Sequence, residues 1–206
     1  MVKIGTTVCL IFGVFFGSVT VSWSADFQAR VDSYKRGNYR AALQVWLALA
    51  EHGDAMGQIR LGDLYLNGQG VPRDTSVAAR WYRLAAEQGY AEAQFNLGLI
   101  YSHRNGVPRV WRVRHQNHKE AAKWYRLAAE QGHAEAQYNL GLMYGKGEGV
   151  MQDLVYAFMW MSISADMGYE RAVNGRNRAA KAMTKSQFKK AQDLARECVR
   201  NEYKGC

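Results

Sequence analysis

Histidine and cysteine side chains, the usual nucleophiles, proton carriers and metal ligands, are few and widely separated in this chain of 206 residues. The three cysteines are Cys9, Cys198 and Cys206, and no zinc-type spacing of Cys and His occurs. His115 and His118 could share one metal on a helix, but they have no further ligands. No phosphate-binding glycine loop or nucleophile elbow is present. The sequence therefore predicts no catalytic residue, no metal site and no cofactor.

Other polar and aromatic residues recur along the chain, and their recurrence favours a structural role. The pairs Glu87-Gln88 and Glu130-Gln131 are interpreted as solvated helix ends rather than acid/base pairs. A set of large aromatic residues repeats in the same phase and is assigned to the core. These residues are Trp81, Tyr82, Trp124, Tyr125 and Trp160. Together these observations favour a non-enzymatic protein.

A basic segment around residues 110–116 is a candidate contact loop. From His103 to Lys119 the chain has no acidic residue. Arginine pairs with phosphate and tryptophan stacks on bases, so this composition would suit nucleic acid, but the expected export of the chain argues against that partner. The alternative is a tolerated surface loop without a ligand. The candidate contact residues are Arg109, Trp111, Arg112 and Arg114.

The C-terminal segment is also basic, with a net charge of +6 from Glu170 to Cys206 within a chain whose formal net charge is +9. Thr184 and Gln187 form a capping box at the start of the last expected helix. Its expected buried stripe consists of Phe188, Ala191, Leu194, Ala195, Cys198 and Val199. Its opposite, basic face consists of Lys185, Lys189, Arg196 and Arg200. This face is either a solubilising cap or a surface that binds an acidic protein or an anionic envelope polymer.

Cys198 and Cys206 form one candidate disulfide. On a continuous helix eight residues span about 12 Å, whereas a disulfide needs Cα atoms within about 7 Å. A bond therefore requires the helix to end first, and Tyr203-Lys204-Gly205 could reverse the chain there. The sequence leaves two alternatives open, a disulfide and two free thiols.

Residues 1–24 have the features of a secretory signal peptide. Lys3 is followed by an uncharged stretch from Ile4 to Val21, and Ser22 and Ser24 suit cleavage before Ala25. A periplasmic or secreted location is therefore expected. The alternative is an uncleaved segment that anchors the protein in the inner membrane, which would be its only contact with a membrane.

The rest of the chain consists of internal repeats. Ala55–Tyr65 returns from Ala91 and again from Ala134, and Ala78–Gly89 returns from Ala121. Each half is expected to be a helix. The second helices begin after N-cap residues, namely Asp74, Asp153 and Asn117 with Glu120. They end at the glycines Gly89, Gly132 and Gly168. Ile59, Leu61, Leu64 and Tyr65 are predicted to form one apolar stripe. Gly62, Gly98 and Gly141 lower helix propensity, which predicts that each admits a close neighbouring helix.

The repeated residues resemble the Sel-1-like repeat, a relative of the tetratricopeptide repeat. The resemblance rests on Leu-Gly followed by Tyr, a turn that ends in Gly-Val, and Trp-Tyr followed by Ala-Ala and Gly. It implies an all-α, right-handed α-solenoid of antiparallel helix pairs with flanking cap helices, used as a protein-interaction adaptor. It implies one alternative too, a cell-wall or β-lactam hydrolase of the secreted type, although the paired cysteines of those relatives are missing here. The expected segments are 1–24 (signal), 25–54 (N-terminal half-repeat), 55–90, 91–133 and 134–169 (repeats) and 170–206 (C-terminal cap).

In such a stack the first helices of the pairs would line a concave binding face. Arg60, Asn96 and Asn139 occupy equivalent positions in the three first helices. Two amides in register could hydrogen-bond the backbone of an extended peptide, or each could satisfy a neighbouring helix. The identity of the protein partner is not set by the sequence.

Overall fold

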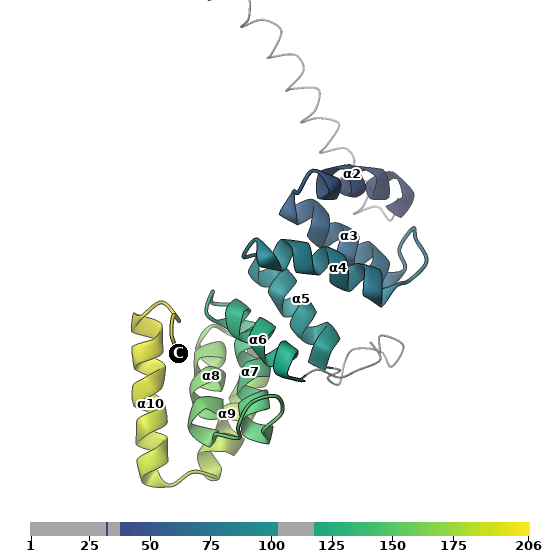
Figure 1. Cartoon of the computed structure of the whole chain (residues 1–206). Coiled ribbons are helices and arrows are strands. Elements are labelled where there is room, and N and C mark those ends of the chain that lie inside the picture. The colour runs from purple at the N-terminus through teal and green to yellow at the C-terminus, as the bar shows by residue number, and fades with distance from the viewer. Residues whose placement is uncertain (1–31, 33–37, 103–117) are drawn as a thin grey trace, which may run out of the picture.

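A computed structural model of the chain describes residues 32, 38–102 and 118–206. Throughout these residues the structure is helical and contains no strand. The helices follow one another from α2 in purple to α10 in yellow, with the C-terminus beside α10 (Figure 1). They are α2 (Tyr39–Glu51), α3 (Ala55–Asn67), α4 (Thr75–Glu87), α5 (Ala91–Ser102), α6 (His118–Ala129), α7 (Ala134–Lys146), α8 (Leu154–Asp166), α9 (Glu170–Lys181) and α10 (Lys185–Arg200).

Each repeat forms one helix pair, and each pair packs on the next. The pairs are α3 with α4, α5 with α6, and α7 with α8, and the second helix of each pair also packs on the first helix of the following one. Before the first pair, α2 packs on α3. The predicted all-α solenoid of helix pairs with flanking helices is confirmed.

The helix ends follow the predicted caps. The Asp74 carboxylate accepts hydrogen bonds from the backbone N–H groups of Ser76 and Val77, and Asp153 does the same at the start of α8. The glycines at 89, 132 and 168 have φ values of +96°, +81° and +89°, the left-handed conformation that glycine adopts without a steric penalty. Asn117, the other predicted N-cap, lies outside the described residues.

The glycine in the middle of each first helix admits a side chain of the second helix. A Cβ atom added at Gly98 would lie 2.5 Å from ring atoms of Tyr125, and one at Gly62 would lie 2.7 Å from Tyr82. The Tyr82 hydroxyl donates to Asp63, and the Tyr125 hydroxyl is 2.9 Å from Ser102 Oγ, so both rings are fixed at their far ends. A Cβ atom added at Gly141 would lie 2.9 Å from Met161 Cγ and 3.1 Å from the Ala157 carbonyl oxygen, so the backbone of α8 also comes close there. The lower helix propensity of these glycines is therefore offset by close helix packing.

The recurring aromatic residues lie in the core with one partial exception. Tyr82, Tyr125 and Trp160 are fully buried and Trp124 is nearly so, whereas Trp81 is only partly buried. The single apolar stripe predicted for the first repeat is wrong. Ile59 packs toward the α4–α5 cluster, while Leu61 and Leu64 pack toward α2. A first helix needs two apolar faces because it lies between two neighbours.

Buried glutamines connect each repeat with the residues that precede it. The side-chain Nε2 groups of Gln58, Gln94 and Gln137 donate to the carbonyls eight residues earlier, at 3.3, 3.1 and 3.1 Å. In the first two repeats a second glutamine, Gln88 or Gln131, donates to the buried amide oxygen. These bonds satisfy polar groups that would be costly to bury alone. We call this series the glutamine ladder.

The C-terminal helices depart from the regular pairing. Among the described helices, α10 packs on α8 rather than forming a pair with α9. Position 177 of α9, the equivalent of Gly141, is an exposed asparagine, so α9 offers no close approach to a following helix. The α8 helix is consequently covered by α7, α9 and α10, and nine of its residues are buried.

The last helix begins with the predicted capping box of Thr184 and Gln187. After α10 the chain reverses, with positive φ at Glu202 and Tyr203, and Cys198 and Cys206 form a disulfide with a Cα–Cα distance of 5.6 Å. Of the predicted buried stripe, Ala191 and Cys198 are buried and Val199 is 49% exposed. The placement of Val199 in that stripe was therefore wrong, because it lies at the edge of the contact with α8.

Among the described residues, none of the helices is both long enough and apolar enough to cross a membrane. The predicted signal segment, residues 1–24, lies outside them.

Candidate interaction surface

Two asparagine side chains lie half-exposed on successive first helices. Asn96 is on α5 and Asn139 is the equivalent residue of α7. Neither amide makes a hydrogen bond to any residue that the structure describes. Each amide therefore offers two donors and an acceptor to a ligand, which is the complement of a peptide backbone. The structure does not show these amides satisfying a neighbouring helix.

Arg60, the third predicted member of the series, has different surroundings. Its guanidinium lies 2.9 Å from the Asp63 carboxylate on its own helix and 3.3 Å from Glu92 on α5. The pair with Glu92 connects α3 with α5, and both pairs engage the cation within the protein. The first helix face therefore changes from an ion-paired arginine in repeat 1 to unbonded amides in repeats 2 and 3.

Aromatic rings form pairs at the positions next to both asparagines in sequence. The rings of Phe95 and His133 are 4.4 Å apart and nearly parallel, and those of Tyr138 and Tyr169 are 5.3 Å apart. In each pair the first ring neighbours an asparagine in sequence, and the second ring comes directly before the next first helix. We call Phe95, Asn96, Tyr138 and Asn139, with their partner rings His133 and Tyr169, the first-helix face. Sequence reasoning missed the rings, although an aromatic residue recurs at 90, 133 and 169.

His133 links this face to the start of α7. It is the N-cap residue of the helix, and its Nδ1 accepts a hydrogen bond from the Ala136 N–H at 3.3 Å. Burial lowers the pKa of the His133 imidazole, and this effect outweighs the nearby carboxylates of Glu135 and Glu92. The ring is consequently neutral at pH 7, as its role as a hydrogen-bond acceptor requires.

The predicted basic loop cannot be placed beside this face. Arg109, Trp111, Arg112 and Arg114 lie outside the described residues, as does His115. Their assignment as contact residues stays a prediction.

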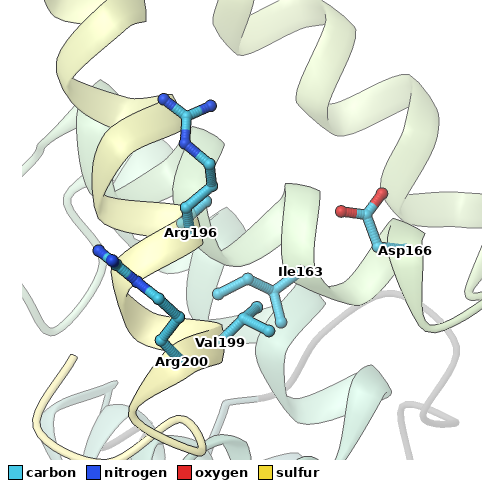
Figure 2. Close-up of a pocket in the computed structure, with 6 residues that line it drawn as sticks. Ile163, Asp166, Arg196, Val199 and Arg200 are labelled. Atoms are coloured by element: carbon cyan, nitrogen blue, oxygen red, sulfur yellow. The ribbon is translucent and has the colours of Figure 1, made fainter.

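The basic face of α10 is solvent-exposed. Lys185, Lys189, Arg196 and Arg200 are all exposed, and Arg196 forms an ion pair with Asp193 on the same helix. Between α8 and α10 lies a pocket of about 470 Å³. Figure 2 shows Ile163 and Val199 facing one another inside it, while Arg196 and Arg200 extend from α10. The pocket has a mainly apolar floor, with Arg196 and Arg200 on the α10 side and the Asp166 carboxylate on the α8 side.

The side chains of the first-helix face and of the α10 face are suited to binding another molecule. In the part of the chain that the structure describes, no three His, Cys, Asp or Glu side chains gather in a way that could hold a metal ion. The first-helix face combines amides with aromatic rings, and the α10 face combines cations with an apolar pocket. Both arrangements suit recognition of another molecule.

The stacked helix pairs, the glycine contacts and the glutamine ladder define an α-helical repeat protein. A family model described as the Sel1 repeat matches residues 55–90, 91–133 and 134–169, more than half of the chain. The chain therefore belongs to the Sel1 repeat family.

Solved structures give the same result. The chain is similar to a Sel1 repeat protein from Oxalobacter formigenes, with 36% identity, a TM-score of 0.56, and coverage of 66% of this chain and 98% of that one. It is also similar to c5321, a protective antigen of uropathogenic Escherichia coli strains that displays an SLR fold. The identity is 26% and the TM-score 0.55, over 90% of this chain and 49% of that protein, so this chain spans about half its length. A comparison with curated protein sequences finds no significant match.

Proposed function

We propose that this protein is an exported, non-enzymatic adaptor that binds an extended segment of a partner protein on its first-helix face. Sel1 repeat proteins generally serve as protein-interaction scaffolds, which supports the general role. The observation that carries the particular proposal is the pair of half-exposed amides, Asn96 and Asn139, which make no hydrogen bond within the described residues. Export is supported by the sequence of residues 1–24.

The arrangement suits a peptide backbone for a physical reason. An extended chain presents N–H and C=O groups at regular intervals, and side-chain amides in register can pair with both. The neighbouring rings offer apolar contact area at a low cost in conformational entropy. Recognition of backbone groups and ring contacts together would hold a peptide without requiring a deep pocket.

A display library of random peptides tests this proposal with the purified protein as the bait. We expect peptides to be selected, and we expect Asn96→Ala/Asn139→Ala to weaken their binding about tenfold, since each lost hydrogen bond contributes about 0.5–1.5 kcal/mol. The matched control replaces two exposed asparagines elsewhere, Asn67→Ala/Asn201→Ala. Failure to select any peptide, or equal weakening by the control, would contradict the proposal.

A second candidate function is supported by the exposed cations of α10. Here the partner is an acidic protein or an anionic envelope polymer, and the binding depends on several charges together because a single exposed ion pair contributes little. Poly-glutamate is a suitable probe at 0.1 M and 1 M salt, where the Debye length falls from about 10 Å to about 3 Å. Neutralising Lys185, Lys189, Arg196 and Arg200 should abolish binding and its salt dependence. Unchanged binding would leave this face a solubilising cap.

A further inference from the structure

An ion pair shows which side chains meet between consecutive first helices. Arg60 of α3 lies 3.3 Å from Glu92 of α5, so the sixth residue of one first helix contacts the second residue of the next. Two equivalent ring pairs show that this register continues along the molecule. The Phe95–His133 pair of α5 and the start of α7 is repeated as Tyr138–Tyr169 at the start of α9.

The same register therefore places a charged residue beside each unbonded asparagine. The equivalent of Glu92 next to Asn96 is Glu135, the second residue of α7. The equivalent next to Asn139 is Arg171, the second residue of α9. Between α3 and α5 the two charges form an ion pair. Between α5 and α7 an amide has a negative charge beside it, and between α7 and α9 an amide has a positive charge beside it.

These two charges are available to a ligand. Glu135 and Arg171 are exposed, and neither forms an ion pair within the described residues. His133 lies near Glu135, but burial lowers the pKa of its imidazole, so it does not neutralise the carboxylate at pH 7. Glu170 precedes Arg171 directly, and adjacent residues of a helix do not face each other. The first-helix face is therefore electrically polarised along its length.

Resting on the proposed function, we propose that the bound segment carries a basic side chain over Glu135 and an acidic side chain over Arg171, so that charge order fixes its direction. Neighbouring packed helices lie roughly 10 Å apart, and an extended chain rises about 3.3 Å per residue. The two partner charges should accordingly stand about three residues apart. The occupant is a peptide with opposite charges at that spacing, in one order only.

Two degenerate nonapeptide libraries test the proposal with the purified, exported protein. One contains Lys-X-X-Glu and the other Glu-X-X-Lys at the centre, and binding is measured by fluorescence anisotropy. We expect one library to bind about five- to tenfold more tightly, since two exposed ion pairs are gained. The double variant Glu135→Lys/Arg171→Glu should prefer the other library, and Glu135→Gln/Arg171→Gln should show no preference. The matched control Glu87→Lys/Arg178→Glu changes the same charges elsewhere and should keep the original preference.

The outcomes separate this inference from the proposed function. Equal binding of both libraries that Asn96→Ala/Asn139→Ala weakens would overturn the charge order and retain the peptide-binding face. A preference that the Glu135/Arg171 swap does not invert would also overturn it, provided that far-UV circular dichroism shows the variant folded. No binding of either library, or binding that the asparagine changes leave intact, would overturn both.

Discussion

The first two repeats and the C-terminal region from repeat 3 onward differ in the contacts that hold their helices together. In repeats 1 and 2 the glutamine ladder is complete, with Gln88 and Gln131 donating to Gln58 and Gln94 at 2.8 and 2.7 Å. In repeat 3 the equivalent of Gln131 is Met167, and among the described residues the buried Oε1 of Gln137 has no hydrogen-bond partner. The difference shows that specific polar contacts hold the repeating interfaces, while flexible methionines fill the site where repetition stops.

The glycine contacts differ in the same way between the two regions. Gly98 is packed against the fixed ring of Tyr125, whereas Gly175 is packed against the unbranched side chain of Met161 alone. A methionine has several rotatable bonds and fits irregular spaces, but an anchored tyrosine does not move. The four predictions below test this contrast, beginning with the largest expected effect.

Removing the disulfide should have the largest effect and should act on the C-terminal end alone. Cys198→Ala/Cys206→Ala opens a loop of about nine residues, which should lower the free energy of unfolding by about 2.5 kcal/mol. Hydrogen exchange should rise around Tyr203, which packs against Gly132, and remain unchanged in α3 and α4. Urea unfolding and hydrogen exchange measure the two effects. A uniform rise in exchange would show that the two regions are not separable.

Adding a methyl group should distinguish the two kinds of glycine contact. Gly98→Ala forces a Cβ atom to within 2.5 Å of Tyr125, so overpacking of about 3 kcal/mol exceeds the gain of about 1 kcal/mol in helix propensity. We expect a net loss of about 2 kcal/mol. Gly175→Ala meets only the end of Met161 and should change stability by less than about 1 kcal/mol. Thermal unfolding of both variants provides the comparison, and equal losses would contradict the contrast.

Completing the glutamine ladder should stabilise the third repeat. Met167→Gln supplies a donor at the position where Gln88 and Gln131 stand in the other repeats, and the new bond to Gln137 should contribute about 1 kcal/mol. The control is Met151→Gln, at a methionine that is 88% exposed, which should leave the unfolding midpoint unchanged. No gain in the first variant would mean that the orphan oxygen of Gln137 cannot reach the new donor.

Acidic pH should have the smallest effect, and it should act between repeats 2 and 3. The pKa of His133 is lowered by burial, so the folded protein binds this proton less readily than the unfolded chain. Stability is then fully present above the unfolded value of about 6.5 and is lost as the pH falls below it toward the lower folded value. His133→Asn keeps a side-chain cap and should reduce the difference in unfolding free energy between pH 7.5 and 5.5. If this difference in unfolding free energy is unchanged in the variant, it arises from other histidines and not from His133.

Much of the fold could be predicted because each repeat contains its own helix signals. The N-caps at Asp74 and Asp153 and the glycines after the helices are local, and a repeated spacing shows that they belong to one unit. What failed were assignments that depend on several neighbours at once. One apolar stripe could not represent α3, which is packed on both sides, and the edge position of Val199 depends on how α10 meets α8.

The candidate site could be predicted only as a set of equivalent positions. The repeat offsets identify Arg60, Asn96 and Asn139 as equivalent. Only the folded structure shows that Arg60 is ion-paired while the two amides make no hydrogen bond within the described residues. The stacked rings require the position of one helix relative to the next, which no spacing within a repeat supplies. The ion pair between Arg60 and Glu92 likewise identifies the charges beside each asparagine.

The incomplete end of the glutamine ladder determines how the molecule could be lengthened. A duplicate of residues 91–133 inserted before Ala134 would bring its own bond from Gln131 to Gln94. Its copy of Gln94 would find the Ala129 carbonyl behind it, and Gln137 would find the copied Ala129 carbonyl, as it finds Ala129 now. A repeat added after Gly168 would instead follow Met167, which supplies no donor to Gln137, and precede α9, where an exposed asparagine at 177 replaces the glycine of the other first helices. Growth by internal duplication is therefore compatible with the interface chemistry, whereas extension at the C-terminal end is not.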